Sequence, residues 1–165
     1  MDDHLFPGGA PMAPPPTQSV IQPTQPNVVP AAPAAVTDPN NLPKMTYHAA
    51  GQGDDTAIVQ WLDGGGHIDA REAETQGTLL MACSTSGDLR LVEALLQRGA
   101  SIDLQGGAEH KGGTALMFAG YMGHYNVVAS LLEHGANKEL NTSQGSTALS
   151  MVEGEGHQDI ALLLK

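Results

Sequence analysis

Residues 113–136 read GTALMFAGYMGHYNVVASLLEHGA, two short apolar runs that each end near a glycine. Thr114 opens the first run, and its hydroxyl can cap the free backbone N–H groups at the start of a helix. In the second run the apolar residues follow one face of a 3.6-residue period, at Val127, Val128 and Leu131. Gly135 comes next, and a glycine there ends a helix in the left-handed conformation. The stretch predicts helix, turn and helix.

The same pattern recurs before and after this stretch. Aligned on Gly53, Gly87, Gly123 and Gly156, the units are spaced by 34, 36 and 33 residues. The positions four, five and eight places after each glycine are apolar, at Ala57, Ile58 and Trp61; Leu91, Val92 and Leu95; Val127, Val128 and Leu131; Ile160, Ala161 and Leu164. Each unit is therefore predicted as two short helices with turns between them. Two to three extra residues around 105–110 are expected to lengthen one loop tip.

A repeat of this length, with Thr-x-Leu at its start, Gly-His in the middle and Gly-Ala at its end, resembles the ankyrin repeat. The resemblance covers about residues 44–165, and residues 113–136 match it best. It departs from the family pattern after the threonine, where Leu79, Ala115 and Ala148 replace proline, and at the usual histidine, replaced by Met81, Met117 and Ser150. The resemblance implies an all-α solenoid of helix–turn–helix units with short hairpin-like turns, with repeats at about 44–74, 75–108, 109–141 and 142–165.

Residues 1–43 have a different composition. All eleven prolines of the 165-residue chain lie between Pro7 and Pro43, without any apolar period around them. Such a segment buries too little apolar surface to offset the entropy of ordering it, so it is predicted to be a disordered Pro/Ala/Gln-rich tail. Two PxxP spacings, Pro11 to Pro14 and Pro23 to Pro26, match segments that dock on aromatic grooves. A solvated spacer is the alternative.

Charge and apolar patterning exclude several classes of protein. Seven basic against eighteen acidic residues give a net charge of −11, which repels nucleic acid. No apolar run approaches the roughly 18 residues that cross a bilayer, and the acidic start is unlike a targeting peptide. An intracellular protein, cytoplasmic or nuclear and not attached to a membrane, is expected. The single cysteine, Cys83, is expected to be a buried apolar residue.

No pattern of catalytic or ligand-binding residues is present. The sequence has no phosphate-binding loop, and its histidines lack the spacing of metal ligands. His124 and His157 occupy equivalent repeat positions, where a structural hydrogen bond is expected. We therefore expect no enzymatic activity, no cofactor and no metal site.

The family resemblance implies that the loop tips and first helices form a concave face that binds a partner protein. By repeat register the candidate partner-binding residues are Glu74, Thr75, Thr85, Ser86, His110, Lys111, Tyr121, Met122, Ser143, Gln144 and Glu155. An adaptor or scaffold is expected, monomeric on its own, whose partner has a basic or neutral surface. The alternative is a permanently bound structural subunit of a larger assembly.

The fourth unit differs from the others at one position. Three places before its aligned glycine it carries Glu153, where the first three units have Ala50, Ser84 and Gly120. A carboxylate is costly to bury, so Glu153 is predicted to face solvent. The fourth unit is accordingly expected to act as a polar cap.

Overall fold

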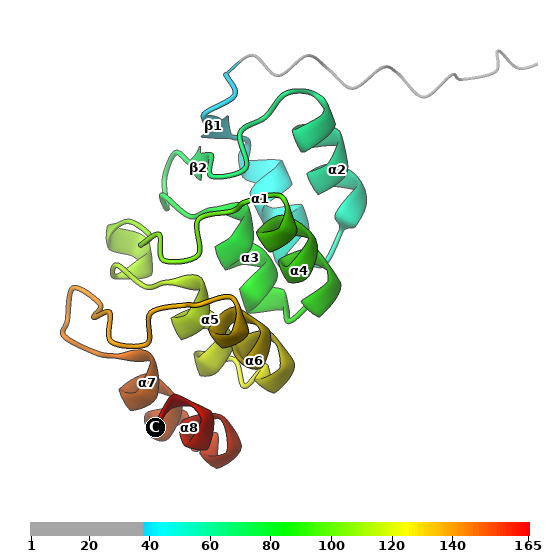
Figure 1. Cartoon of the computed structure of the whole chain (residues 1–165). Helices are drawn as coiled ribbons and strands as arrows, with labels where there is room; N and C mark the ends of the chain where they lie inside the picture. Colours follow the sequence, from blue (N-terminus) through cyan, green and yellow to red (C-terminus); the bar gives the residue numbers. More distant parts are fainter. Residues whose placement is uncertain (1–37) are drawn as a thin grey trace, which may run out of the picture. The chain divides into compact units, whose positions relative to one another are not determined.

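Each repeat unit folds into a pair of short helices, as Figure 1 shows for the computed structural model, which describes residues 38–165. The first helices of the four units are α1 (Lys44–Gly51), α3 (Leu79–Ser86), α5 (Ala115–Tyr121) and α7 (Ala148–Glu155). The second helices are α2 (Asp55–Asp63), α4 (Leu89–Gln97), α6 (Tyr125–Glu133) and α8 (Gln158–Leu164). The expected all-α repeat architecture is confirmed. The tail predicted to be disordered comprises residues 1–43. Of these, residues 1–37 lie outside the described part.

The helices stack in two rows. In the first row α1 contacts α3, α3 contacts α5 and α5 contacts α7; in the second row α4 contacts α6 and α6 contacts α8. Each helix has only about two turns, and five of the eight begin with a side-chain cap, from Asp54, Thr78, Asp88, Thr114 and Thr147. The rows therefore place residues of equivalent repeat register side by side, one unit after another.

Threonine starts three of the first-row helices, as the sequence predicts. The hydroxyls of Thr78, Thr114 and Thr147 accept the backbone N–H three residues on, at 3.4, 3.4 and 3.2 Å. In the fourth unit the hydroxyl of Ser150 also accepts the Thr147 N–H at 2.9 Å, which completes a capping box. Serine at this position, where the repeat pattern that the sequence resembles has histidine, thus stabilises the start of α7.

The predicted apolar stripes form the core. Buried residues on the second-row helices are Ile58 and Trp61; Leu91, Val92 and Leu95; Val127, Val128 and Leu131; Ile160, Ala161 and Leu164. Ala57 is only half-buried. Cys83 is fully buried on α3, and burial raises the pKa of its thiol to about 12, which keeps it protonated and unreactive.

The packed region begins before Lys44, which corrects the expected boundary at residue 43. Asn41–Leu42 form strand β1, paired in parallel with β2 (Arg71–Glu72). Leu42 is 1 % exposed, and the Pro39 carbonyl accepts the His67 N–H at 2.7 Å. Proline lacks a donor but keeps its acceptor, so the proline-rich composition conceals a segment that pairs through its carbonyls.

The extra residues around 105–110, at the end of the second unit, lengthen a loop tip, as predicted. They form a 3₁₀ turn, η1 (Ala108–His110). The side-chain amide of Gln105 donates to the carbonyls of Gly112 and Asn141, at 2.9 and 2.8 Å. The longer tip is therefore tied to the next unit.

Neighbouring units are joined by hydrogen bonds that recur in the same register. The His124 ring donates from Nε2 to the Thr85 carbonyl at 3.0 Å, and His157 does the same to the Tyr121 carbonyl at 3.3 Å. The structural role expected for these histidines is confirmed. In the loops Asp69 accepts the Ser101 N–H at 2.8 Å, and Asp103 accepts the Asn137 N–H at 2.9 Å.

The prediction for Glu153 is confirmed. Its side chain is 47 % exposed and lies 3.2 Å from the Lys165 ammonium. An exposed ion pair of this kind contributes little to stability, so the position is a solvated surface.

Candidate interaction surface

A groove of about 710 Å³ runs along the face made by the first-row helices and the loop tips. All four units contribute to it: α1, α3, α5 and α7 supply residues, as do the tips at 109–113 and 142–146. Its size falls within the range of ligand-binding clefts. We call this hollow the groove below.

Aromatic rings from two units meet in the groove. The Tyr47 hydroxyl and His110 Nε2 share a hydrogen bond of 2.8 Å, and the His110 ring meets Phe118 edge-on with centroids 5.1 Å apart. Burial raises the pKa of the Tyr47 phenol and lowers the pKa of the His110 imidazole. Both groups are therefore uncharged at neutral pH, and the wall they form is apolar with one satisfied polar contact.

Glycines make room for this wall. A Cβ atom on Gly77 would lie 2.6 Å from the Tyr47 oxygen, and one on Gly113 would lie 3.0 Å from Phe118 Cζ. Both glycines stand in the turn before the capping threonine of their unit. The absence of a side chain at these two turn positions thus allows the aromatic rings to approach the loop backbone closely.

Two further large side chains project beside the cluster. Tyr121 and Met122, at the C-terminal end of α5, are 44 % and 47 % exposed. Of the five Phe, Trp and Tyr residues in the described part, three line the groove: Tyr47, Phe118 and Tyr121. Aromatic side chains make up 4 % of the sequence, and three of the five in residues 38–165 lie on this one face.

A family model described as ankyrin repeats, in three copies, matches residues 46–142 and 79–165. The chain belongs to the ankyrin-repeat family. Ankyrin repeats are generally protein–protein interaction modules and are typically not enzymes. A search of curated proteins found no significant match.

The groove of this ankyrin-repeat domain contains seven of the residues chosen by register. They are Thr85, His110, Lys111, Tyr121, Met122, Gln144 and Glu155. Four do not line it. The Ser86 hydroxyl donates to the Cys83 carbonyl at 2.9 Å, and the Ser143 hydroxyl donates to the Lys111 carbonyl at 3.1 Å. Glu74 and Thr75 belong to a different set of contacts.

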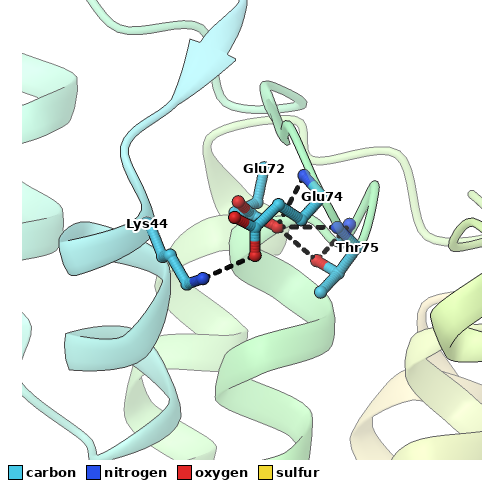
Figure 2. A network of polar contacts seen from close by, with 5 residues as sticks. Lys44, Glu72, Glu74 and Thr75 are labelled. Atoms are coloured by element: carbon cyan, nitrogen blue, oxygen red, sulfur yellow. Dashed lines mark hydrogen bonds and ion pairs between the residues drawn. The ribbon is translucent and has the colours of Figure 1, made fainter.

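Those contacts surround Glu72, the buried carboxylate in Figure 2. It accepts the backbone N–H and the hydroxyl of Thr75 at 2.7 and 2.8 Å, and the Glu74 N–H at 3.1 Å. Burial alone would raise its pKa, but these donors lower it below the ordinary value. Glu74 forms an ion pair with Lys44. Glu74 and Thr75, both predicted to bind a partner, therefore stabilise the first loop tip of the ankyrin domain.

Register missed several residues of the groove. Tyr47, Phe118 and Met151 line it. Tyr47 was missed because the first unit lacks the threonine that marks the register. Phe118 and Met151 were missed because their positions indicate core residues of their helices. Tyr47 on α1 and Phe118 on α5 are separated by α3 and are linked through His110 of the long loop tip. The cluster becomes visible only once this tip is placed beside α1.

In residues 38–165 no group of three His, Cys, Asp or Glu side chains is arranged to hold a metal ion. No helix in the same range has the length and apolarity needed to cross a membrane.

Proposed function

We propose that this ankyrin-repeat domain is an adaptor that binds a partner protein in the groove. The observation that supports this most directly is the exposure of Tyr121 and Met122 beside the aromatic wall. Tyrosine is enriched at the energetic centres of interfaces, and methionine adapts to irregular partner surfaces. A partner that covers these two side chains removes apolar area from water without disturbing the core.

Charge favours a partner segment that is not acidic. The chain carries a net charge of −11, so an acidic protein approaching it is repelled at long range. A basic surface is attracted and a neutral one is not repelled, and this acts mainly on the association rate. We place this interaction in the cytoplasm or nucleus and assign the domain no catalytic role.

The test compares two exposed tyrosines of the full chain. Tyr121 lies in the groove, whereas Tyr125 is 41 % exposed on α6 and does not line it. Tyr121→Ala is expected to abolish capture of a specific set of proteins from native extract, measured by quantitative mass spectrometry, and Tyr125→Ala to preserve it. Identical capture by both variants and the unchanged chain would reject the groove as the binding surface.

An adaptor and a permanently bound subunit differ in the fraction of the chain that is found without a partner. An adaptor exchanges partners, so native extract should contain both free chain and complex in size-exclusion profiles. A chain found only in one large complex would favour the permanent-subunit alternative.

A further inference from the structure

The long loop tip, residues 105–113, is held at its base by the loops on either side. The Gly107 N–H donates to the Thr75 carbonyl at 2.9 Å, and the Ser143 N–H donates to the Lys111 carbonyl at 2.7 Å. Both are bonds between backbone amides, which do not titrate. The base of the tip is therefore fixed whatever the charge of its side chains.

A single side chain joins the tip to the first unit. Among residues 38–165, the bond of 2.8 Å between His110 Nε2 and the Tyr47 hydroxyl is the one hydrogen bond that connects the tip to α1 or α2. On its other side the imidazole meets the Phe118 ring edge-on, with centroids 5.1 Å apart. We call this arrangement, in which the His110 ring lies between Tyr47 and Phe118, the latch.

The latch depends on an uncharged imidazole. When Nδ1 carries the proton, Nε2 has a lone pair that accepts the hydroxyl of Tyr47. A protonated ring has donors on both nitrogens, so the phenol can no longer donate to it. The aromatic neighbours also exclude water from the ring, which opposes its charging. Protonation therefore removes the hydrogen bond in this direction and adds a cost of desolvation.

The ionisable groups around the latch come from three elements. They are Glu109 and Lys111 on the tip, Glu72 on β2, and Tyr47 and His48 on α1, whereas α5 presents the uncharged Phe118. The carboxylates of Glu109 and Glu72 favour the charged imidazole, but burial outweighs them and lowers the pKa of His110 below the ordinary 6.5. The latch is thus most stable above pH 6.5 and weakens as pH falls from 6.5 towards the lower pKa of the closed form.

We propose that His110 is a pH-sensitive latch: the neutral ring closes the long tip onto Tyr47 and Phe118, and protonation releases it. The inference rests on the proposed function and concerns the regulation of the groove. The closed latch completes the apolar wall on which a partner packs. A released imidazolium interrupts this wall, and a partner that covers it must remove its hydration. Mild acidification therefore weakens binding in the groove.

Opening of the latch is measured in the full chain without a partner. Histidine ¹⁵N NMR between pH 8 and pH 5, with His110→Ala to assign the signals, should show Nδ1 protonated in neutral His110. Its titration midpoint should lie below 6.5, and the ring signals of Tyr47 and Phe118 should shift with that midpoint. Protonation on Nε2 of the neutral ring, or aromatic signals that do not follow the His110 midpoint, would overturn the proposal.

Two tyrosine variants test the hydrogen bond of the latch. Tyr47→Phe keeps the ring and removes the hydroxyl, so the His110 midpoint should rise by about 0.4–1 pH unit, the equivalent of one hydrogen bond to the neutral imidazole. Tyr121→Phe is the matched control, because it removes a groove hydroxyl that is not bonded to His110, and it should leave the midpoint unchanged. Equal midpoints in both variants would contradict the latch.

The effect on the groove is the ratio of binding at pH 7.5 to binding at pH 5.5. The probe is the protein most enriched in the capture experiment, purified and titrated with the full chain. This ratio should be about threefold or more for the unchanged chain and close to one for His110→Phe, which keeps an uncharged ring. His48→Phe replaces another histidine of the groove and should behave as the unchanged chain does. The same ratio in His110→Phe and the unchanged chain would overturn the regulation.

Failure of this inference is distinguishable from failure of the proposed function. If Tyr121→Ala abolishes capture while His110→Phe keeps the full pH dependence, the groove binds a partner without being regulated by the latch. If capture does not depend on Tyr121, the groove is not the binding surface, and the His110 titration alone then decides whether the latch exists.

Discussion

At the scale of single residues, Glu72 shows how a buried charge is tolerated. It is the one charged side chain fully removed from solvent among residues 38–165, at 3 % exposure. Three donors from Glu74 and Thr75 hydrogen-bond its carboxylate, and such bonds offset the cost of removing a charge from water. The turn before the second unit is fixed by this contact.

The lowered pKa of Glu72 gives this contact a pH dependence. Because the pKa is lower in the folded state than the ordinary value of 4.5, the stabilisation is complete above that value and is lost as pH falls through the folded-state pKa. Glu72→Gln should lower the free energy of unfolding by about 1–3 kcal/mol at pH 7, because an amide accepts these bonds less well. The difference between variant and unchanged chain should shrink as the solution is acidified below pH 4.5.

Urea unfolding followed by circular dichroism between pH 3 and pH 8 measures this difference. Glu139→Gln, an exposed carboxylate in a later loop, is the control and should show no such trend. A Glu72→Gln deficit that stays constant across the range would contradict the assignment.

At the scale of elements, the junction between α5 and α6 depends on a glycine and a histidine from different units. Gly123 has φ +78°, and a Cβ atom there would lie 2.6 Å from the His157 ring. Gly156 stands at the same repeat position with φ +82° and has no atom within 4 Å of such a Cβ. The two glycines share the left-handed backbone and differ only in their neighbours.

Alanine at these two glycines should therefore have unequal effects. Gly156→Ala should cost about 1–2 kcal/mol, the strain of a side chain in the left-handed conformation. Gly123→Ala should cost more, because the added methyl group also displaces His157. In the His157→Ala background the excess should disappear, as measured by chemical unfolding in a double-mutant cycle. Equal costs in the original background would show that the ring yields freely.

The strand β1 gives a second prediction at this scale. A chain that begins at Lys44 lacks the buried Leu42 and the pairing with Arg71–Glu72. It should be less stable than a chain that begins at Asp38, by about 2–5 kcal/mol, the cost of removing a buried leucine. Thermal unfolding of the two truncated chains makes the comparison. Matching unfolding temperatures would mean that β1 is not part of the cooperative unit.

The elements show which features were predictable. Helices and caps followed from the threonines, the apolar stripe and the closing glycine, since all of these act within one unit. β1 did not, because Leu42 is a single apolar residue among prolines and its burial depends on Arg71–Glu72 some thirty residues away. The groove was predicted in part: exposed register positions such as Tyr121 were found. Tyr47 and Phe118 were missed, because they are linked through His110, whose loop tip reaches back from the third unit to the first.

At the scale of the whole molecule, helix packing runs from each unit to the next, and the Tyr47–His110 hydrogen bond at the loop tip reaches one unit further. First-row helices pack on the next first-row helix, and α4, α6 and α8 do the same in the second row. Stability in such an array is close to a sum of unit and interface contributions. Damage at one end is therefore expected to remain local, while damage in the middle removes support from both sides.

Native-state hydrogen exchange tests this expectation with two buried residues. Ile160→Ala in α8 should lower amide protection in α7 and α8 by about 2–5 kcal/mol and leave α3 and α4 nearly unchanged. Leu95→Ala in α4 should lower protection in all four units. A uniform loss of protection in Ile160→Ala would show that the described region opens as a single unit.

The hydrogen bond that recurs between the loops of neighbouring units affects how the number of repeats can change in evolution. Residues 75–108 carry both halves of it: the Ser101 N–H donates to Asp69 of the unit before, and Asp103 accepts from Asn137 of the unit after. A tandem duplication of this segment in the gene would supply a new donor and a new acceptor together. The array can thus change in length by whole repeats without a compensating substitution at this bond on either side.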